Sequence, residues 1–405
     1  MIKNIGKGAR LLIASDLIYR LTAIFIDTFL VAYLLKITNE NITTISLYYI
    51  TIYGLRVIIP HFVGMIIKKQ PSTNKEFLSL GIIVRAVFIL FIAVLSDKIT
   101  SYFITIAIIY AISETFYWYP HEAIYISVTT NKNRNNYMAF RKILYQVIGI
   151  ISPIIFGTSI ELYSFSKIAI WVFLLSVVQI VLTFCIKTNV DKKEPKKYSY
   201  KKFLKYVKDN QLTKIKSYHH SGVAYGILES SINTLIVVIT VMTFKTSFNL
   251  GVLTSVFAVC AILSLIIYSK FGNKKNFNKT LILCSIVIIT GVVATLIDIN
   301  KISLIIYNFC YILTFSIFDV IYNAKKGNLL KDCKIQEYQE EYIIYASISV
   351  CLGRAIGYTL MLIASFTGNV NFLKLLLALF TLFAPIFCYY ISKTEDKKKI
   401  AISKQ

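Results

Sequence analysis

The sequence predicts an all-α integral membrane protein with twelve transmembrane helices arranged as two six-helix halves. Composition, the spacing of apolar runs and the placement of charges carry this prediction. Of the 405 residues, 56% are hydrophobic and only 16% are charged, and the mean hydropathy is +0.66. A soluble domain has about 25% charged residues. The composition therefore excludes an ordinary soluble enzyme and also a disordered tail.

The apolar runs have the length of membrane-spanning helices, which need about 20 mostly apolar residues. Twelve windows qualify, at 11–35, 45–67, 77–95, 102–128, 138–160, 167–186, 217–243, 248–268, 280–297, 302–324, 342–366 and 371–391. The gaps between them are short except for 187–216, which has eleven lysines and three acids. We therefore expect an N-terminal six-helix bundle over 1–186, a basic linker, and a C-terminal six-helix bundle over 217–405.

The positive charge indicates how the chain is oriented in the membrane. The net charge is +24, and most of the lysines and arginines fall at the two ends, in 187–216 and in alternate gaps. Cytoplasmic loops are enriched in these residues, so both termini and the linker are expected in the cytoplasm. Because the charges lie between apolar runs, no nucleic-acid partner is expected. The linker could contact anionic lipid headgroups, but a solvated connector is the favoured interpretation.

The sequence offers little support for cofactor or metal chemistry. The seven cysteines include no C-x-x-C pair and lie mostly inside apolar runs, which argues against a disulfide framework or a zinc site. There is no phosphate-binding G-x-x-x-x-G-K-S/T loop. The predicted outside loops are too short for a catalytic domain. We therefore expect no cofactor, no metal and no enzyme activity.

Charged residues inside the spans are the candidate functional residues, because burying a charge in a bilayer costs several kcal/mol unless it faces a cavity or a partner. These residues are Asp16, Arg20, Asp27, Arg56, Arg85, Glu114, Glu122, Glu229, Asp319 and Arg354.

Glu114 is the strongest of these candidates. One face of its predicted helix carries polar and aromatic side chains at helical spacing: Glu114, Trp118, His121 and Tyr125. Partial burial favours the protonated form of a carboxyl group, so we predict that Glu114 loads and releases a proton. Arg85 or Arg56 is its expected counter-ion. The alternative is a permanent ion pair that holds the N-terminal half together.

Two further groups complete the candidate cavity. Asp16, Arg20 and Asp27 share one side of the first predicted helix, although Asp16 and Arg20 could instead form an internal ion pair. In the C-terminal half, the candidates for substrate contacts are Glu229, Asn233 and Arg354. Arg354 lies between two glycines that permit close helix contact, so a structural pairing with Asp319 or Glu229 is equally expected.

Several short motifs recur in the two halves. Gly64-Met-Ile-Ile-Lys68-Lys69 follows the second span, and Ser269-Lys270-Phe271-Gly272-Asn273-Lys274-Lys275 follows the eighth. Glu122-Ala-Ile-Tyr125 and Asp319-Val-Ile-Tyr322 lie near the inner ends of the fourth and tenth spans.

With six plus six helices, these motifs resemble the major facilitator superfamily. The resemblance implies two halves that rock about a central cavity lined by helices 1 and 7, and a monomer. It also implies a cytoplasmic gate in which Glu122 pairs with Lys69, and Asp319 pairs with Lys270 or Lys274.

The predicted function is secondary active transport by alternating access, coupled to protons or another ion. Export of a small amphiphilic compound across a bacterial plasma membrane is the first expectation, because acids outnumber arginines within the spans. A flippase for a lipid-linked sugar, or a symporter for sugar or peptide uptake, remains open. Outside transport, the alternatives are a membrane sensor and a membrane-embedded transferase.

Overall fold

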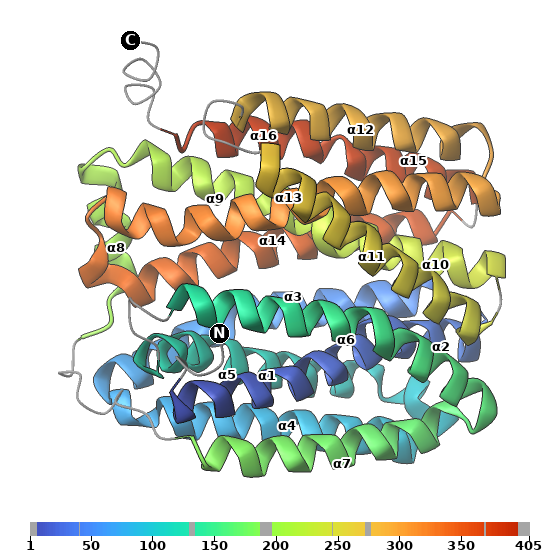
Figure 1. Ribbon diagram of the computed structural model, residues 1–405, viewed down its shortest axis with the longest axis horizontal. Helices are drawn as coiled ribbons and strands as arrows, with labels where there is room; N and C mark the ends of the chain where they lie inside the picture. The colour runs from blue at the N-terminus through green and yellow to red at the C-terminus, as the bar shows by residue number, and fades with distance from the viewer. Residues whose placement is uncertain are drawn as a thin grey trace. The chain divides into compact units, whose positions relative to one another are not determined.

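The computed structural model describes residues 6–39, 41–128, 134–186, 197–244, 246–271, 277–367 and 370–395. Across these described residues all regular structure is helical (Figure 1). In chain order the helices are α1 (Lys7–Ile24), the π-helical η2 (Phe25–Leu30), α2 (Val31–Ile37), α3 (Ile42–Lys69), η3 (Pro71–Thr73), α4 (Asn74–Leu95), η4 (Ser96–Ser101), α5 (Phe103–Val128), α6 (Arg134–Leu162), α7 (Phe165–Phe184), α8 (Tyr200–Asp209), α9 (Thr213–Gly226), the π-helical η6 (Ile227–Ser231), α10 (Ile232–Phe244), α11 (Ser247–Phe271), α12 (Phe277–Ile297), α13 (Lys301–Asp332), η8 (Gln336–Tyr338), α14 (Gln339–Ser365), α15 (Val370–Thr381) and α16 (Phe383–Ser392).

Each window that the sequence marks as a span lies on helix. In the described part of the chain, eleven helices are long and apolar enough to cross a membrane. The exception among the predicted windows is α5, which has 26 residues but is interrupted by polar groups such as Glu114 and His121. The chain is therefore a multi-span membrane protein.

Side-chain caps fix where several of these helices begin. The side-chain oxygen of Asn41 accepts hydrogen bonds from the backbone amides of Thr43 and Thr44, at 2.9 and 3.4 Å, and so starts α3. Asn300 and Ser303 form a reciprocal capping box at the start of α13. Such caps satisfy amides that have no partner inside the helix.

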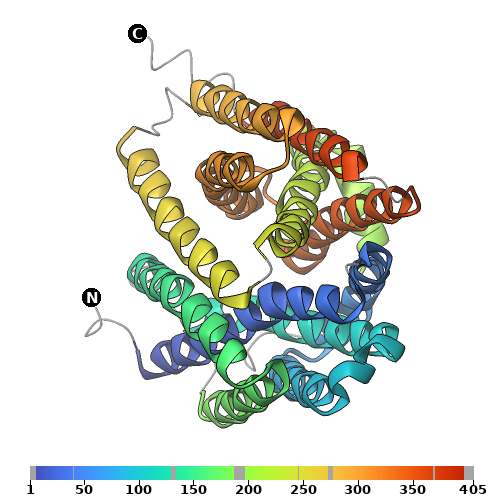
Figure 2. The same ribbon diagram turned by 90° about the vertical axis from the view of Figure 1, so that its right-hand side faces the viewer.

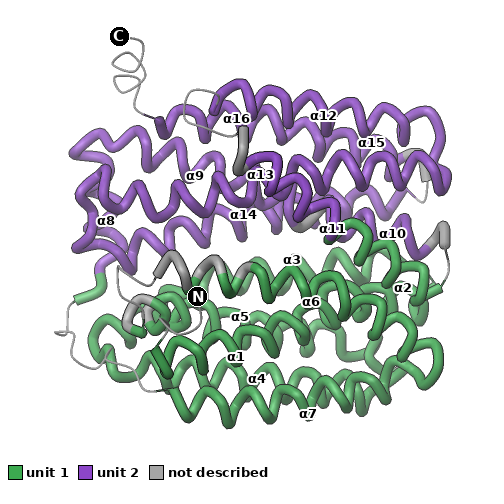
Figure 3. Tube along the Cα trace, viewed as in Figure 1, with its two compact units in different colours: residues 1–198, 244–258 green, residues 199–243, 259–405 purple. Residues whose placement is uncertain are grey.

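The chain divides into two compact units (Figure 3). Unit 1 comprises residues 1–198 and 244–258, and unit 2 comprises residues 199–243 and 259–405. The predicted linker at 187–216 is more than a connector, since α8 and the first turn of α9 lie within it.

Unit 1 brings the helices of the strongest candidates together. Helix α4 packs against α5 and α7, and α1 packs against α6 and α7 (Figure 2). The approach of α4 to α5 depends on Gly81, because a Cβ atom there would lie 2.7 Å from the backbone nitrogen of Tyr117. Close contact between these two helices places Arg85 opposite Glu114.

Unit 2 uses glycines for its closest contact, between α9 and α14. A Cβ atom on Gly226 would lie 2.2 Å from the carbonyl oxygen of Val350, and one on Gly353 would lie 2.0 Å from that of Val223. Neither position has room for a larger residue. This confirms that the glycine beside Arg354 serves close helix packing.

Candidate functional site

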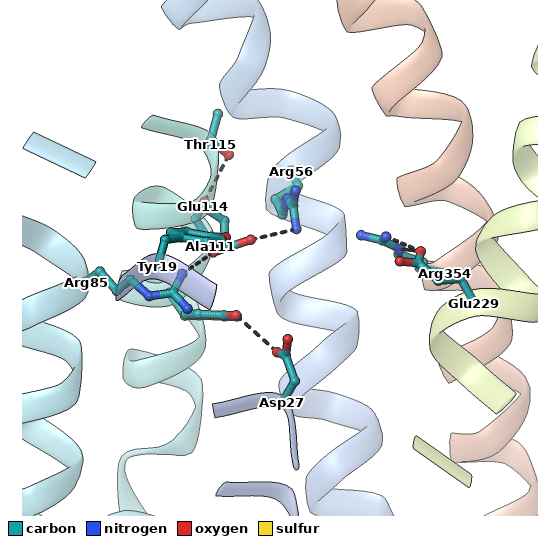
Figure 4. Close-up of polar contacts among 10 residues, drawn as sticks. Tyr19, Asp27, Arg56, Arg85, Ala111, Glu114, Thr115, Glu229 and Arg354 are labelled. Carbon is teal, nitrogen blue, oxygen red and sulfur yellow. Dashed lines mark hydrogen bonds and ion pairs between the residues drawn. The ribbon is translucent and has the colours of Figure 1, made fainter. Parts of the chain in front are cut away.

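Glu114 lies at the centre of a buried ion-pair cluster in unit 1 (Figure 4). Its side chain on α5 is 7% exposed. The Tyr19 hydroxyl donates to Oε1 at 2.6 Å, and Arg85 Nη1 contacts the same oxygen at 2.6 Å. Arg56 Nη1 lies 3.5 Å from Oε2. Both arginines that the sequence nominated as counter-ions of Glu114 therefore contact it.

Arg85 on α4 is held from several sides. Its Nε donates to the Thr22 hydroxyl at 2.9 Å, and its guanidinium carbon lies 4.2 Å from the centre of the Tyr19 ring. Such cation–π contacts add to the ion pair, and more strongly where the cation is buried, as Arg85 is. Its Nη2 is buried without a hydrogen-bond partner among the described residues. Nη2 of Arg85 is thus still able to donate a hydrogen bond.

Asp16 forms a second cluster, in which all contacts come from α5 and α6. It is fully buried. His121 Nε2 lies 2.7 Å from Oδ1, and the Tyr117 hydroxyl donates to the same oxygen at 2.8 Å. Arg141 Nε lies 2.8 Å from Oδ2, and the Tyr137 hydroxyl donates to that oxygen at 3.4 Å.

The suggested Asp16–Arg20 pair is wrong. Arg20 is exposed, and Asp16 has its ion pairs with His121 and Arg141 instead. Residues four apart lie on the same side of a helix, so the spacing allowed the pair, but side chains of α5 and α6 surround the Asp16 carboxylate instead. His121 therefore belongs with Asp16, although it lies on the same helix as Glu114.

Arg141 is not among the candidates that the sequence predicts, because it lies near the start of its span, close to the basic residues of the preceding gap. Its position inside the predicted span at 138–160 could have identified it as a candidate. Sequence reasoning also missed the tyrosines that bind both carboxylates, since 28 tyrosines give no reason to choose these. Trp118 touches both clusters, with ring centres 5.2 Å from Tyr19 and 5.7 Å from His121.

Asp27 differs from the other two acids in how few contacts it makes. It lies in η2, the π-helical part of the first span, and is exposed. Its hydrogen bond comes from a neutral group, the Tyr110 hydroxyl, at 3.2 Å (Figure 4). Π-helical turns are rare and are frequent at functional sites.

Unit 2 repeats this arrangement. Glu229 lies in η6, and Arg354 Nε on α14 donates to its carboxylate at 3.0 Å. Asp319 and Glu229 were the expected partners of Arg354, and Glu229 contacts it. Asp319 accepts hydrogen bonds from the Tyr225 hydroxyl and from Asn323 Nδ2, each at 2.7 Å. Asn233 is exposed on α10, one turn beyond Glu229.

The two units thus share two features. Each has a π-helical segment with an acid at its third position, Asp27 in η2 and Glu229 in η6. In each, a tyrosine from the helix before that segment donates to an acid on a facing helix: Tyr19 to Glu114, and Tyr225 to Asp319. This repetition is stronger than the short motifs found in the sequence.

The predicted gate pairs stay predictions. Glu122 is half-buried on α5, and Lys69 is exposed at the end of α3. The side chain of Lys270 and the whole of Lys274 lie outside the described residues. As for metals, the described residues contain no group of three or more potential ligands.

Comparison with known proteins agrees with this fold. A structure of the nucleoside transporter NupG superposes with a TM-score of 0.72 at 11% identity, covering 96% of this chain and 100% of that one. A POT family transporter in complex with 5-aminolevulinic acid gives 0.69 at 11% identity, with 96% and 97% covered. Another, bound to a thioalcohol-conjugated peptide, gives 0.69 at 13% with the same coverage.

No curated protein sequence matches the chain. The sequence profile of the Major Facilitator Superfamily, by contrast, matches residues 13–325, well over half of the length. This family membership indicates a transporter rather than an enzyme. The chain belongs to the Major Facilitator Superfamily.

Proposed function

We propose that this protein is a proton-coupled secondary transporter that works by alternating access, and that Asp27 takes up and releases the coupling proton. The proposal moves the proton from Glu114, the residue favoured by the sequence, to Asp27. Glu114 keeps the other role considered for it, a charged group that holds helices of unit 1 together.

The contrast between the partners of the two acids carries this proposal. Protonating Glu114 would weaken its contacts with two arginines and a tyrosine hydroxyl at once. Among the described residues, protonating Asp27 disturbs one hydrogen bond, from neutral Tyr110. A proton carrier must exist in both forms during the cycle, and the exposed Asp27 can change its charge at much lower cost.

The Glu229–Arg354 pair is the proposed substrate contact in unit 2. Its side chains are 28% and 15% exposed, so it is more accessible than the Glu114 cluster. Arg20 and Asn233, both exposed, are proposed to bind polar groups of the substrate as well. The Asp16 cluster is assigned to helix packing because Asp16 is fully buried.

For topology, we propose that α5 is the twelfth crossing and that both termini are cytoplasmic. Helix α5 has the length for a crossing and packs against α3 and α4, which are themselves long and apolar enough to span. Glu114 and His121 on this helix are buried against neighbouring helices, so they need not face lipid. The expected location is a plasma membrane, and the expected state is a monomer.

Export of a small amphiphilic compound stays our proposal for substrate and direction. The named structural neighbours are a nucleoside transporter and transporters bound to 5-aminolevulinic acid or a peptide conjugate. They support a polar nucleoside or peptide as the second candidate substrate, for which we propose uptake. Thermal stabilisation against nucleosides, peptides, sugars, lipophilic cations and glycolipids decides between them, because a ligand that binds only the folded protein raises its Tm.

The proton assignment is tested in proteoliposomes with an internal pH-sensitive dye, using the compound that gives the largest stabilisation. The wild type should move protons when substrate is added. Asp27→Asn should abolish this proton movement while substrate exchange without a gradient continues. Asp209→Asn, at the exposed end of α8, is the matched control and should behave like the wild type.

Two results would contradict the proposal in different ways. Proton movement that survives Asp27→Asn but is lost in Glu114→Gln, with binding intact, returns the carrier role to Glu114. Substrate transport without any proton movement in the wild type refutes proton coupling itself.

A further inference from the structure

Helix α8 is a short helix with two distinct faces. Phe203 and Val207 on one face are 0% and 3% exposed. The Ser199 side chain caps the helix start by accepting from the backbone amide of Lys202 at 3.4 Å. The helix is therefore a packed element of unit 2, in contrast to the solvated connector that the basic composition favoured.

The buried face of α8 is attached to the first turns of α14. The Phe203 ring lies 5.8 Å from the ring of Tyr338 and 5.7 Å from that of Tyr345. The backbone amide of Ser199 donates to the carboxylate of Glu341, which is 1% exposed, at 3.0 Å. Aromatic contacts of this kind stabilise a packed helix beyond the apolar area that they bury.

These contacts place α8 at the depth where a span begins. The candidate span that includes α14 starts at Gln336 and ends at Ser365. Tyr338, Glu341 and Tyr345 lie in its first turns, within about 15 Å of its end at 1.5 Å per residue. Because polar headgroups begin where a span ends, we expect a helix held there to lie at their level.

The opposite face of α8 carries three lysines and a leucine. We call Lys201, Leu204, Lys205 and Lys208 the lysine face. Their spacing of three and four residues places them on one side of the helix, and all four are exposed, Leu204 by 39%. A cationic face with an apolar residue is typical of helices that lie on anionic membranes.

We propose that the lysine face binds the headgroups of anionic phospholipids in the leaflet where α14 begins. Charge complementarity identifies the occupant: three exposed cations beside the membrane fit phosphate groups, and Leu204 fits the adjoining acyl chains. A polybasic segment gains about 1 kcal/mol for each lysine near an anionic surface, which is about fivefold in affinity. Bound lipid would thereby stabilise α8 and the start of α14.

The test titrates phosphatidylglycerol into the purified, detergent-solubilised full-length protein and follows Tm. Phosphatidylglycerol should raise Tm, while phosphatidylcholine at equal amounts should not. For Lys201→Gln/Lys205→Gln, the phosphatidylglycerol concentration giving half of the effect should rise by about 25-fold. Raised salt should weaken the effect in the wild type, since these charges are exposed.

The control variant is Lys331→Gln/Lys334→Gln, which removes the same charge from exposed positions at the end of α13. It should titrate like the wild type. Equal titration of wild type and the α8 variant would overturn the proposal, as would equal stabilisation by phosphatidylcholine. Stronger stabilisation by soluble polyglutamate than by phosphatidylglycerol would also overturn it and indicate an acidic protein partner.

Discussion

Tyr19 and Tyr117 stack face to face, with ring centres 3.9 Å apart, and each donates its hydroxyl to a carboxylate on the helix of the other. Tyr19 on α1 binds Glu114 on α5, while Tyr117 on α5 binds Asp16 on α1. In each helix the acid precedes the tyrosine by three residues, so both lie on one face. The two ion-pair clusters of unit 1 are therefore joined through one aromatic pair.

Removing either hydroxyl should destabilise the protein without altering its fold. Tyr19→Phe and Tyr117→Phe each leave a buried carboxylate with one donor fewer, and hydrogen bonds to charged groups contribute about 1.5–3 kcal/mol. Thermal unfolding in detergent measures the loss. Tyr163→Phe, at a position 63% exposed, is the control and should leave Tm unchanged. Unchanged Tm in both buried variants would show that the carboxylates find other donors.

Replacing only Arg85 or only Glu114 should lower the free energy of unfolding more than replacing both residues. Arg85→Gln leaves a buried carboxylate and Glu114→Gln leaves a buried guanidinium, and losing one partner of a buried pair costs about 3–5 kcal/mol. The double variant leaves two neutral side chains and should recover much of this. A double-mutant cycle on unfolding free energies checks it, and additive losses would contradict a direct interaction.

Shortening the π-helical segment in the first span should abolish coupled transport. An α-helix turns by about 100° per residue, so deleting Thr28 rotates Asp27 relative to α2 by that amount. The same compound and dye assay as for Asp27→Asn measures the effect. Thr28→Ala keeps the length and should retain transport. Full activity of the deletion variant would show that the wider turn has no part in the cycle.

Truncating Phe203 should release α8 from α14. Phe203→Ala removes a fully buried ring, a change that costs about 3–5 kcal/mol in a packed core. Because opened helices are cut faster, trypsin should cleave within α8 more rapidly, as mass spectrometry of the fragments can measure. Leu204→Ala on the exposed face should be cut at the wild-type rate. Equal cleavage of both variants would mean that the aromatic contacts do not hold α8.

The membrane class and the windows that contain helices could be predicted because they depend on composition and apolar run length. The family could be predicted from a resemblance, carried by the six-plus-six organisation and the motifs that recur in the two halves. The pairing of Glu114 with arginines could also be predicted, since a charge inside a span needs a partner. The partners of Asp16 could not be predicted, because Arg141, Tyr117 and Tyr137 come from two other helices. Helix α8 was missed for a different reason: its lysines dominate the composition, while Phe203 and Val207 alone give it a buried side.

The paired π-helical segments bear on the ancestry of the chain. Each is a local irregularity in an otherwise regular span, and each has its acid at the third position, Asp27 in one and Glu229 in the other. Without a common origin, two independent events would have to produce the same irregularity in the two units. The simpler history is that one ancestral segment carried the irregularity and was duplicated. Later divergence then changed the partner, which is a tyrosine for Asp27 and an arginine for Glu229.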